Sequence, residues 1–273
     1  MVTSSLRNVS RPAQAVGFGS DEVRKKDPSG SADRGLPAGY LGRWAPQPPI
    51  WMEFRGWFER RELLRDVVFA GDGVPSGRGR AVLLVPGFMT GDSSLAPLRD
   101  WLDRTGYDAE HAGIRFNVRY SEAVLSRLAD RLAQIHTRLR QKVTVVGHSR
   151  GGLLGKVLAH RSPRMVERVV ALGAPLGDPY DLHPLTVAGV RLAQVYNLVR
   201  YLSTASVERR FLRDLEAPAR VPLVSVYSRT DGIVHWEACR RPDAECIEVD
   251  GSHIGLTVNP EVYRHLARIL PPS

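Results

Sequence analysis

The most informative part of the chain, residues 143–155, reads Val143-Thr-Val-Val-Gly147-His-Ser149-Arg-Gly151-Gly-Leu-Leu-Gly155. The β-branched residues before Gly147 favour a strand, and the apolar residues after Gly151 recur at helical spacing. A Gly-x-Ser-x-Gly turn between a strand and a helix is typical of a nucleophile elbow, a strained turn that exposes the serine Oγ. Ser149 is therefore the candidate nucleophile.

A serine hydroxyl needs a histidine to take its proton and an acid to orient that histidine. In one common chain order, the acid and then the histidine follow the serine. Asp231 comes just after a candidate strand, residues 221–227, and His253 lies in a glycine-flanked loop after a second candidate strand, residues 246–249. Because open α/β sheets build their sites at the carboxyl ends of strands, we expect Asp231 and His253 to serve Ser149 there.

Three other aspartates compete for the role of the acid. Asp178 and Asp181 follow an earlier candidate strand, residues 168–172, and rank second. Asp250 lies so close to His253 in sequence that only a tight local loop would let it reach the far imidazole nitrogen. A solvated turn residue is the better interpretation of Asp250, so Asp231 is the first choice.

The oxyanion of an acyl-transfer intermediate needs two backbone N–H donors. One is expected from Arg150, which directly follows the candidate nucleophile. The other is expected from the loop after a predicted strand over residues 81–86. In that loop Phe88 is the first choice and Met89 the second.

Short motifs that match a known family run through most of the chain: Leu84–Phe88, Gly91–Asp92, Pro97–Arg99, Gly147–Gly152, Leu172–Pro175, Tyr227–Val234 and Gly251–Leu256. With these motifs the chain, from about residue 48 to its C-terminus, resembles bacterial α/β-hydrolases of the lipase/esterase type. The resemblance implies hydrolysis of small-molecule carboxylic esters by Ser149, Asp231 and His253 as a triad. It implies no cofactor and no metal.

Two residues depart from the pattern of that family. Pro86 stands where many such enzymes have histidine before the glycine, and Arg150 replaces a commoner apolar residue. A bulky cation beside the nucleophile can change the shape of the acyl site, so the family's substrates do not transfer to this chain. The same triad also serves acyltransferases and thioesterases. A catalytically silent scaffold that binds an acyl ligand or a protein partner is a further alternative, against which the complete triad argues.

The chain is expected to form a mobile tail over residues 1–45 and one α/β-hydrolase domain over residues 46–273. Strands alternating with helices predict a mostly parallel sheet with helices on both faces. A helical insertion at about residues 177–219 has an apolar stripe at largely helical spacing, formed by Val187, Val190, Leu192, Val195, Leu198, Val199 and Leu202. It either caps an apolar acyl site or packs as one more core helix.

Residues 48–70 contain Trp51, Phe54, Trp57, Phe58 and Leu64, which suggest an amphipathic helix. The expected role of this aromatic face is packing on the domain's own core. Binding to a membrane surface is the alternative, and it is less favoured because no large basic face accompanies the aromatic residues in the sequence.

The net charge of +9 arises from dispersed cations, and no DNA- or RNA-binding motif is present. We therefore expect no specific nucleic-acid partner and at most a weak preference for anionic surfaces.

No apolar signal-peptide core and no run of about 20 apolar residues occurs, which favours a cytoplasmic protein without a transmembrane segment. In that compartment Cys239 and Cys246 are expected to be free thiols, although a disulfide between them, or a zinc site with His235 and His253, is conceivable. The sequence indicates no oligomeric state.

Overall fold

The computed structural model describes residues 48–201 and 205–270, so the predicted N-terminal tail lies outside the described residues. The helices and strands follow one another in the order η1 (Ile50–Phe54), α1 (Arg55–Leu63), α2 (Val67–Ala70), β1 (Ala81–Val85), η2 (Asp92–Leu95), α3 (Ala96–Arg104), β2 (Asp108–His111), α4 (Ser121–Leu139), β3 (Val143–His148), α5 (Arg150–Arg161), β4 (Val166–Leu172), α6 (Pro184–Tyr201), α7 (Ala205–Glu216), β5 (Leu223–Ser228), α8 (Trp236–Cys239), β6 (Glu245–Val249), η3 (Gly255–Thr257) and α9 (Pro260–Ile269).

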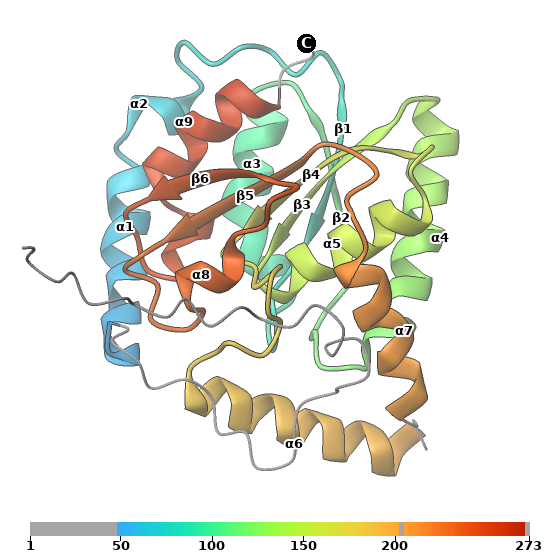
Figure 1. Cartoon of the computed structure of the whole chain (residues 1–273). Helices are drawn as coiled ribbons and strands as arrows, with labels where there is room; N and C mark the ends of the chain where they lie inside the picture. The colour runs from blue at the N-terminus through green and yellow to red at the C-terminus, as the bar shows by residue number, and fades with distance from the viewer. Residues whose placement is uncertain (1–47, 202–204, 271–273) are drawn as a thin grey trace, which may run out of the picture. The chain divides into compact units, whose positions relative to one another are not determined.

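The six strands form one sheet in the order β2-β1-β3-β4-β5-β6, and every neighbouring pair is parallel. Every residue of β1 and β3 is buried, because helices cover both faces of the sheet at these central strands. The parallel arrangement brings the carboxyl ends of β3, β4 and β5 to one edge (Figure 1). The predicted mostly parallel sheet is therefore confirmed.

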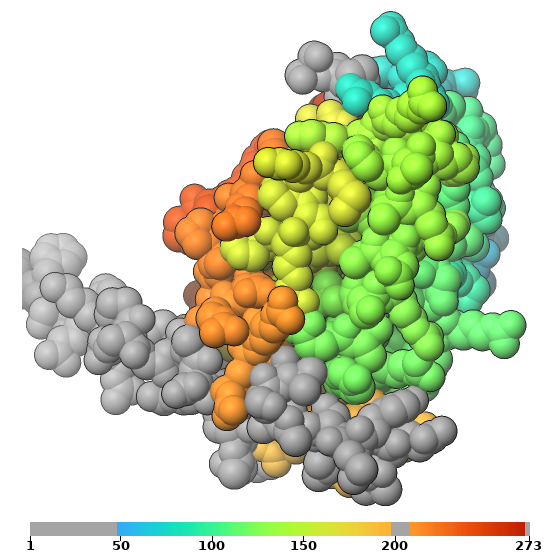
Figure 2. Space-filling view, turned by 90° about the vertical axis from the view of Figure 1, so that its right-hand side faces the viewer, coloured from blue at the N-terminus to red at the C-terminus, as the bar shows by residue number. Residues whose placement is uncertain are grey.

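The two faces of the sheet carry separate hydrophobic clusters. Apolar residues of α4, α5 and α7 pack on one face, and residues of α3 and α9, together with Leu63 and Val68, pack on the other. Figure 2 shows the outer surface of α4 beside that of α7, coloured green and orange. On the opposite face, the buried Trp101 indole donates a hydrogen bond to the Val68 carbonyl at 2.7 Å. This bond joins α3 to the N-terminal helices.

The interpretation of the aromatic residues near the N-terminus is wrong. Trp51, Phe54, Trp57 and Phe58 have exposed fractions of 62–79%, so their rings do not pack on the core. The inward positions of η1 and α1 are occupied instead by Glu53, Gly56, Glu59 and Leu63. The helical face that turns inward is thus largely acidic, and its partners lie beside the candidate catalytic residues described below.

Helices α6 and α7 connect β4 to β5, within the predicted insertion at residues 177–219. Helix α6 has a buried side and an exposed side. Val187 is buried and packs against Leu182, Tyr227 and Val234, whereas Leu192 is 73% exposed. Leu198, Val199 and Leu202, also predicted to be part of the apolar stripe, have side chains outside the described residues. Cys239 and Cys246 are free thiols, as the sequence favoured. Among the described helices, none is long and apolar enough to cross a membrane.

Candidate active site

Ser149 lies in a sharp turn between β3 and α5. Its backbone has φ 52° and ψ −122°, a conformation that a residue with a Cβ adopts at a cost on the order of 1–3 kcal/mol. The turn is held by a hydrogen bond from the Ser149 amide to the Leu172 carbonyl at 2.7 Å. A Cβ on Gly147 would lie 2.3 Å from the Gly151 carbonyl oxygen, and a Cβ on Gly151 would lie 2.1 Å from the Val85 carbonyl oxygen. Both glycines of the motif are therefore sterically required.

His253 and Asp231 are in direct contact. His253 Nδ1 lies 2.6 Å from Asp231 Oδ2, and both residues are almost completely buried. The other carboxylate oxygen, Oδ1, accepts hydrogen bonds from the amides of Ile233 and Val234, each at 2.8 Å. These two amides fix the carboxylate, so its free oxygen holds the imidazole with Nδ1 protonated and leaves Nε2 as the proton acceptor.

The rival acids have other partners. Asp250 accepts a hydrogen bond from Thr230 Oγ1 at 2.6 Å and forms an ion pair with Arg55 at 3.2 Å. Asp178 Oδ1 accepts from the Tyr180 amide, and Asp181 faces His235 rather than His253. The structure therefore brings His253 together with Asp231, the first choice from the sequence, and with none of the other three.

The pKa of His253 is raised by its surroundings. Burial alone lowers the pKa, but the charge of Asp231 and the hydrogen bond to it outweigh burial, and the charge of Glu53 adds a smaller increase. The neighbouring imidazole of His148 behaves in the opposite way: burial, with a contribution from His253, lowers its pKa to about 3. His148 is thus neutral at physiological pH.

His148 also connects the serine turn to the histidine loop. Its Nε2 donates a hydrogen bond to the His253 carbonyl oxygen at 2.9 Å, and the two rings are 4.8 Å apart. A Cβ on Gly173, at the end of β4, would lie 3.1 Å from His253 Nδ1. Through these contacts the residue directly before Ser149 fixes the position of the His253 loop.

The loop after β1 approaches the serine turn closely. A Cβ on Gly87 would lie 3.3 Å from Ser149 Cβ, so the next residue, Phe88, follows at the edge of the candidate site. The Met89 amide donates to the Asn117 carbonyl at 3.2 Å and is therefore occupied. Within the described part of the chain, the amides of Phe88 and Arg150 make no such bond. The geometry favours Phe88 over Met89 as the second oxyanion donor.

The side chain of Arg150 is half-buried and bound on several sides. Its Nη1 donates to the Asn117 side-chain and main-chain oxygens at 2.8 and 3.1 Å, and its Nη2 donates to the Arg119 carbonyl. Asn117 in turn donates to the Pro86 carbonyl at 2.8 Å, which ties the guanidinium to the Phe88 loop. Burial lowers the pKa of Arg150 to about 10, so the side chain stays charged. The Arg150 side chain therefore stabilises the loop geometry.

Glu53 is a site residue that the sequence analysis missed. Its Oε1 accepts hydrogen bonds from the Gly232 amide at 2.9 Å and the His253 amide at 3.1 Å. Its Oε2 accepts from the Ile254 amide at 2.9 Å. One buried carboxylate from η1 thus holds both the loop of Asp231 and the loop of His253.

Glu59, in α1, supports the same loop from the other side. Its two oxygens accept from the Ser252 amide at 2.9 Å and from Ser252 Oγ at 3.0 Å. A Cβ on Gly255 would lie only 1.2 Å from Glu59 Oε2, so the loop must carry a glycine there. Burial raises the pKa of Glu59, although the hydrogen bonds from Ser252 oppose the increase. The two acids Glu53 and Glu59 were the signal of this role in the sequence. The loops that they bind are distant from them along the chain.

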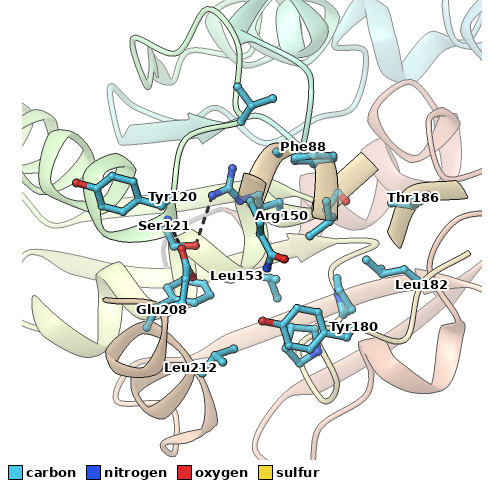
Figure 3. Close-up of a pocket in the computed structure, with 18 of the residues that line it drawn as sticks. Phe88, Tyr120, Ser121, Arg150, Leu153, Tyr180, Leu182, Thr186, Glu208 and Leu212 are labelled. Atoms are coloured by element: carbon cyan, nitrogen blue, oxygen red, sulfur yellow. Dashed lines mark hydrogen bonds between the residues drawn. The ribbon is translucent and has the colours of Figure 1, made fainter. Parts of the chain in front are cut away.

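A cavity of about 450 Å³ opens from Ser149 and is bordered by both predicted oxyanion residues (Figure 3). Its wall is mainly apolar and includes Leu153, Leu182, Val190 and Leu212. Helices α6 and α7 each contribute to the wall. A polar end is formed where the Ser121 amide donates to Glu208 Oε1 at 2.8 Å, close to the Arg150 guanidinium.

Comparison with known proteins identifies the fold of the chain through similar solved structures. No family model matches the chain, and no curated protein matches it. Among solved structures it is similar to the mature lipase of Bacillus licheniformis, with a TM-score of 0.55, 18% identity, and coverage of 73% of this chain and 95% of that one.

Two further similar structures agree with the first. An α/β-hydrolase enzyme from the metagenome of lagoon sediments at Mar Chica, Morocco, matches with a TM-score of 0.51 and 19% identity over 71% of this chain and 91% of that one. A monoacylglycerol lipase from Paleococcus ferrophilus matches with a TM-score of 0.50 and 18% identity over 72% of this chain and 96% of that one. With its parallel sheet and these structural neighbours, the chain has the α/β-hydrolase fold.

Proposed function

We propose that this protein is a serine hydrolase of carboxylic esters. The supporting observation is the 2.6 Å contact between Asp231 and His253, in a loop that His148 joins to the turn where the next residue, Ser149, is held at φ 52°. Structural neighbours that are lipases and esterases agree with this proposal at the level of the fold. Because their identity to this chain is below one fifth, the proposed roles of individual residues rest on the site itself.

In the proposed reaction, Ser149 Oγ attacks the ester carbonyl carbon while His253 Nε2 takes the hydroxyl proton. The amides of Phe88 and Arg150 bind the negative charge that develops on the carbonyl oxygen. The tetrahedral intermediate collapses, the bond to the alcohol oxygen breaks, and His253 returns its proton to the leaving alcohol. Water then attacks the acyl-enzyme with His253 again as the base. Asp231 keeps Nδ1 protonated throughout, and no cofactor takes part.

The apolar wall of the cavity supports an ester with an apolar acyl chain as the substrate. The inner face of α6 lines the cavity through Thr186, Val190 and Ala193, while α7 contributes Phe211 and Leu212. These two helices are the proposed cap over the acyl site. Burial of each methylene of the chain is worth about 0.8 kcal/mol until the cavity is filled.

The proposed nucleophile is tested with a fluorophosphonate probe, which reacts with activated serines. Wild-type protein is expected to be labelled at Ser149 alone, as located by peptide mass spectrometry. Ser149→Ala should remove both the label and the ester hydrolysis, because the remaining oxyanion contacts cannot supply the covalent step. Labelling that persists in Ser149→Ala contradicts the proposal. Ser126→Ala serves as the control, since Ser126 is an exposed serine of α4.

The proposed acyl site predicts a dependence on chain length. Val190→Ser should lower kcat/KM for an octanoate ester by about 5- to 10-fold and leave acetate hydrolysis nearly unchanged, because only the longer chain reaches the altered wall. Leu192→Ser is the matched control, since Leu192 lies on the same helix but is 73% exposed. Kinetics on a series of 4-nitrophenyl esters provide the measurement. Equal losses on all esters, with a lowered Tm, would instead indicate that α6 acts only as a core helix.

A further inference from the structure

The N-terminal helices present an aromatic face to solvent. We use this name for Trp51, Phe54, Trp57 and Phe58, whose exposed fractions are 66%, 79%, 62% and 64%. The edge of the Trp57 ring meets Phe58, with ring centroids 5.0 Å apart. Leu64 and Val67, farther along the chain, are also exposed, and so is Ile254, which lies next to Gly56 of α1. The fold does not need these side chains inside, because the inward positions belong to Glu53, Glu59 and Leu63.

So many large apolar side chains on one exposed helical segment indicate an interaction surface. The charges beside them narrow the choice of partner. Arg60, Arg61 and Arg65 are all exposed, and the Arg61 guanidinium lies 5.8 Å from the centre of the Trp57 ring. Within residues 50–65, all of which the structure describes, Glu62 is the only exposed acid. The buried glutamates leave a surface that is both aromatic and basic.

Charge complementarity decides between the possible occupants. Residues 1–47 contain seven Arg and Lys against four Asp and Glu, so their net charge has the same sign as these arginines and is not complementary to them. A second copy of the chain would bring the same arginines against each other. An anionic bilayer accepts both features, because aromatic rings enter the boundary between headgroups and acyl chains while arginines bind the lipid phosphates.

We propose that the aromatic face docks the protein on an anionic membrane surface. The net charge of +9 adds long-range attraction to the same partner. The face also adjoins the candidate site. A Cβ on Gly56 would lie 3.5 Å from Ile254 Cγ2, and Ile254 directly follows His253. Docking therefore brings the His253 loop close to the lipid surface. This inference concerns location on a membrane and does not depend on the reaction that the site performs.

The test is co-sedimentation of the full-length protein with vesicles. Binding is expected with phosphatidylcholine that contains phosphatidylglycerol, and it should weaken with added salt and with phosphatidylcholine alone. The variant Trp51→Ser/Phe54→Ser/Phe58→Ser should bind at least ~10-fold more weakly, and so should Arg60→Gln/Arg61→Gln/Arg65→Gln. Both variants should keep wild-type hydrolysis of a water-soluble short ester and wild-type Tm.

A matched control comes from the other exposed apolar helix. Leu192→Ser/Val195→Ser removes comparable apolar area from α6, where the two residues are 73% and 58% exposed, and it should leave vesicle binding unchanged. Failure of the wild-type protein to bind anionic vesicles would overturn the proposal. So would equal binding by the aromatic variant, or loss of binding in the α6 variant. A dimer that the aromatic variant dissociates, seen by light scattering without vesicle binding, would identify a second copy as the occupant instead.

Discussion

Replacing Asp231 with asparagine is expected to lower kcat by roughly 10⁴-fold, with little change in KM. The side-chain amide introduced there would present either a donor or a weaker acceptor to His253 Nδ1, which lies 2.6 Å from Asp231 Oδ2. The imidazole would then favour the tautomer with the proton on Nε2, where it cannot accept the proton of Ser149. Steady-state kinetics on a soluble ester give the measurement.

The other acidic residues provide the controls for this prediction. Asp178→Asn, Asp181→Asn and Asp250→Asn should each cost far less activity, because the carboxylates bind the Tyr180 amide, face His235 and bind Thr230, respectively. A loss of several orders of magnitude in one of these three variants, with Asp231→Asn active, would mean that the acid has been assigned to the wrong strand end.

Glu53→Gln is expected to lower kcat by about 10²-fold although Glu53 lies outside the cavity wall. The carboxylate accepts three backbone N–H bonds, whereas glutamine turns an NH₂ group towards at least one of those donors. The resulting shift misaligns Asp231 and His253 with respect to Ser149. Because the cavity itself is unchanged, KM should change little.

The pH profile distinguishes this positioning role from a general loss of stability. His253 must be neutral to act as the base, so kcat/KM falls at low pH as His253 becomes protonated. Glu53 is one of the charges that raise the pKa of His253. Its removal therefore lowers that pKa, and the acid limb of the profile should move to lower pH. Glu62→Gln, an exposed neighbour in α1, is the matched control and should move neither kcat nor the acid limb. An unshifted limb in Glu53→Gln, with kcat reduced only in proportion to the folded fraction, would contradict the prediction.

Local sequence patterns were enough for the serine turn and the central strands. The residues around Ser149 specify strand, turn and helix within one short stretch, because two glycines are sterically required there. The contact of Asp231 with His253 was also predictable, since each residue follows a strand and the parallel sheet brings both strand ends to one edge. Such inferences succeed when a residue's surroundings follow from its own neighbours in sequence.

The edge strand β2 was not predicted, because it reads Asp-Ala-Glu-His and has no apolar run. Its acids are compatible with a strand only because α4 supplies partners: Arg138 pairs with Asp108, and Arg131 pairs with Glu110. The assignment of the N-terminal helix failed for the same reason. The aromatic residues looked like the buried side, whereas Glu53 and Glu59 turn inward because distant loops provide N–H donors for them. Periodicity indicates which residues share a face, but it does not indicate what that face meets.

The position of Glu53 in the chain has a consequence for biosynthesis. Its hydrogen-bond partners Gly232 and His253 follow it by 179 and 200 residues, so they leave the ribosome long after Glu53 does. Contacts of such high sequence separation form late in folding. Before those loops are made, the Glu53 carboxylate lacks the three N–H donors that bind it in the folded domain, and the histidine loop lacks this acceptor. On the proposed mechanism, the nascent chain should therefore hydrolyse no ester before the His253 loop has been made and has bound Glu53.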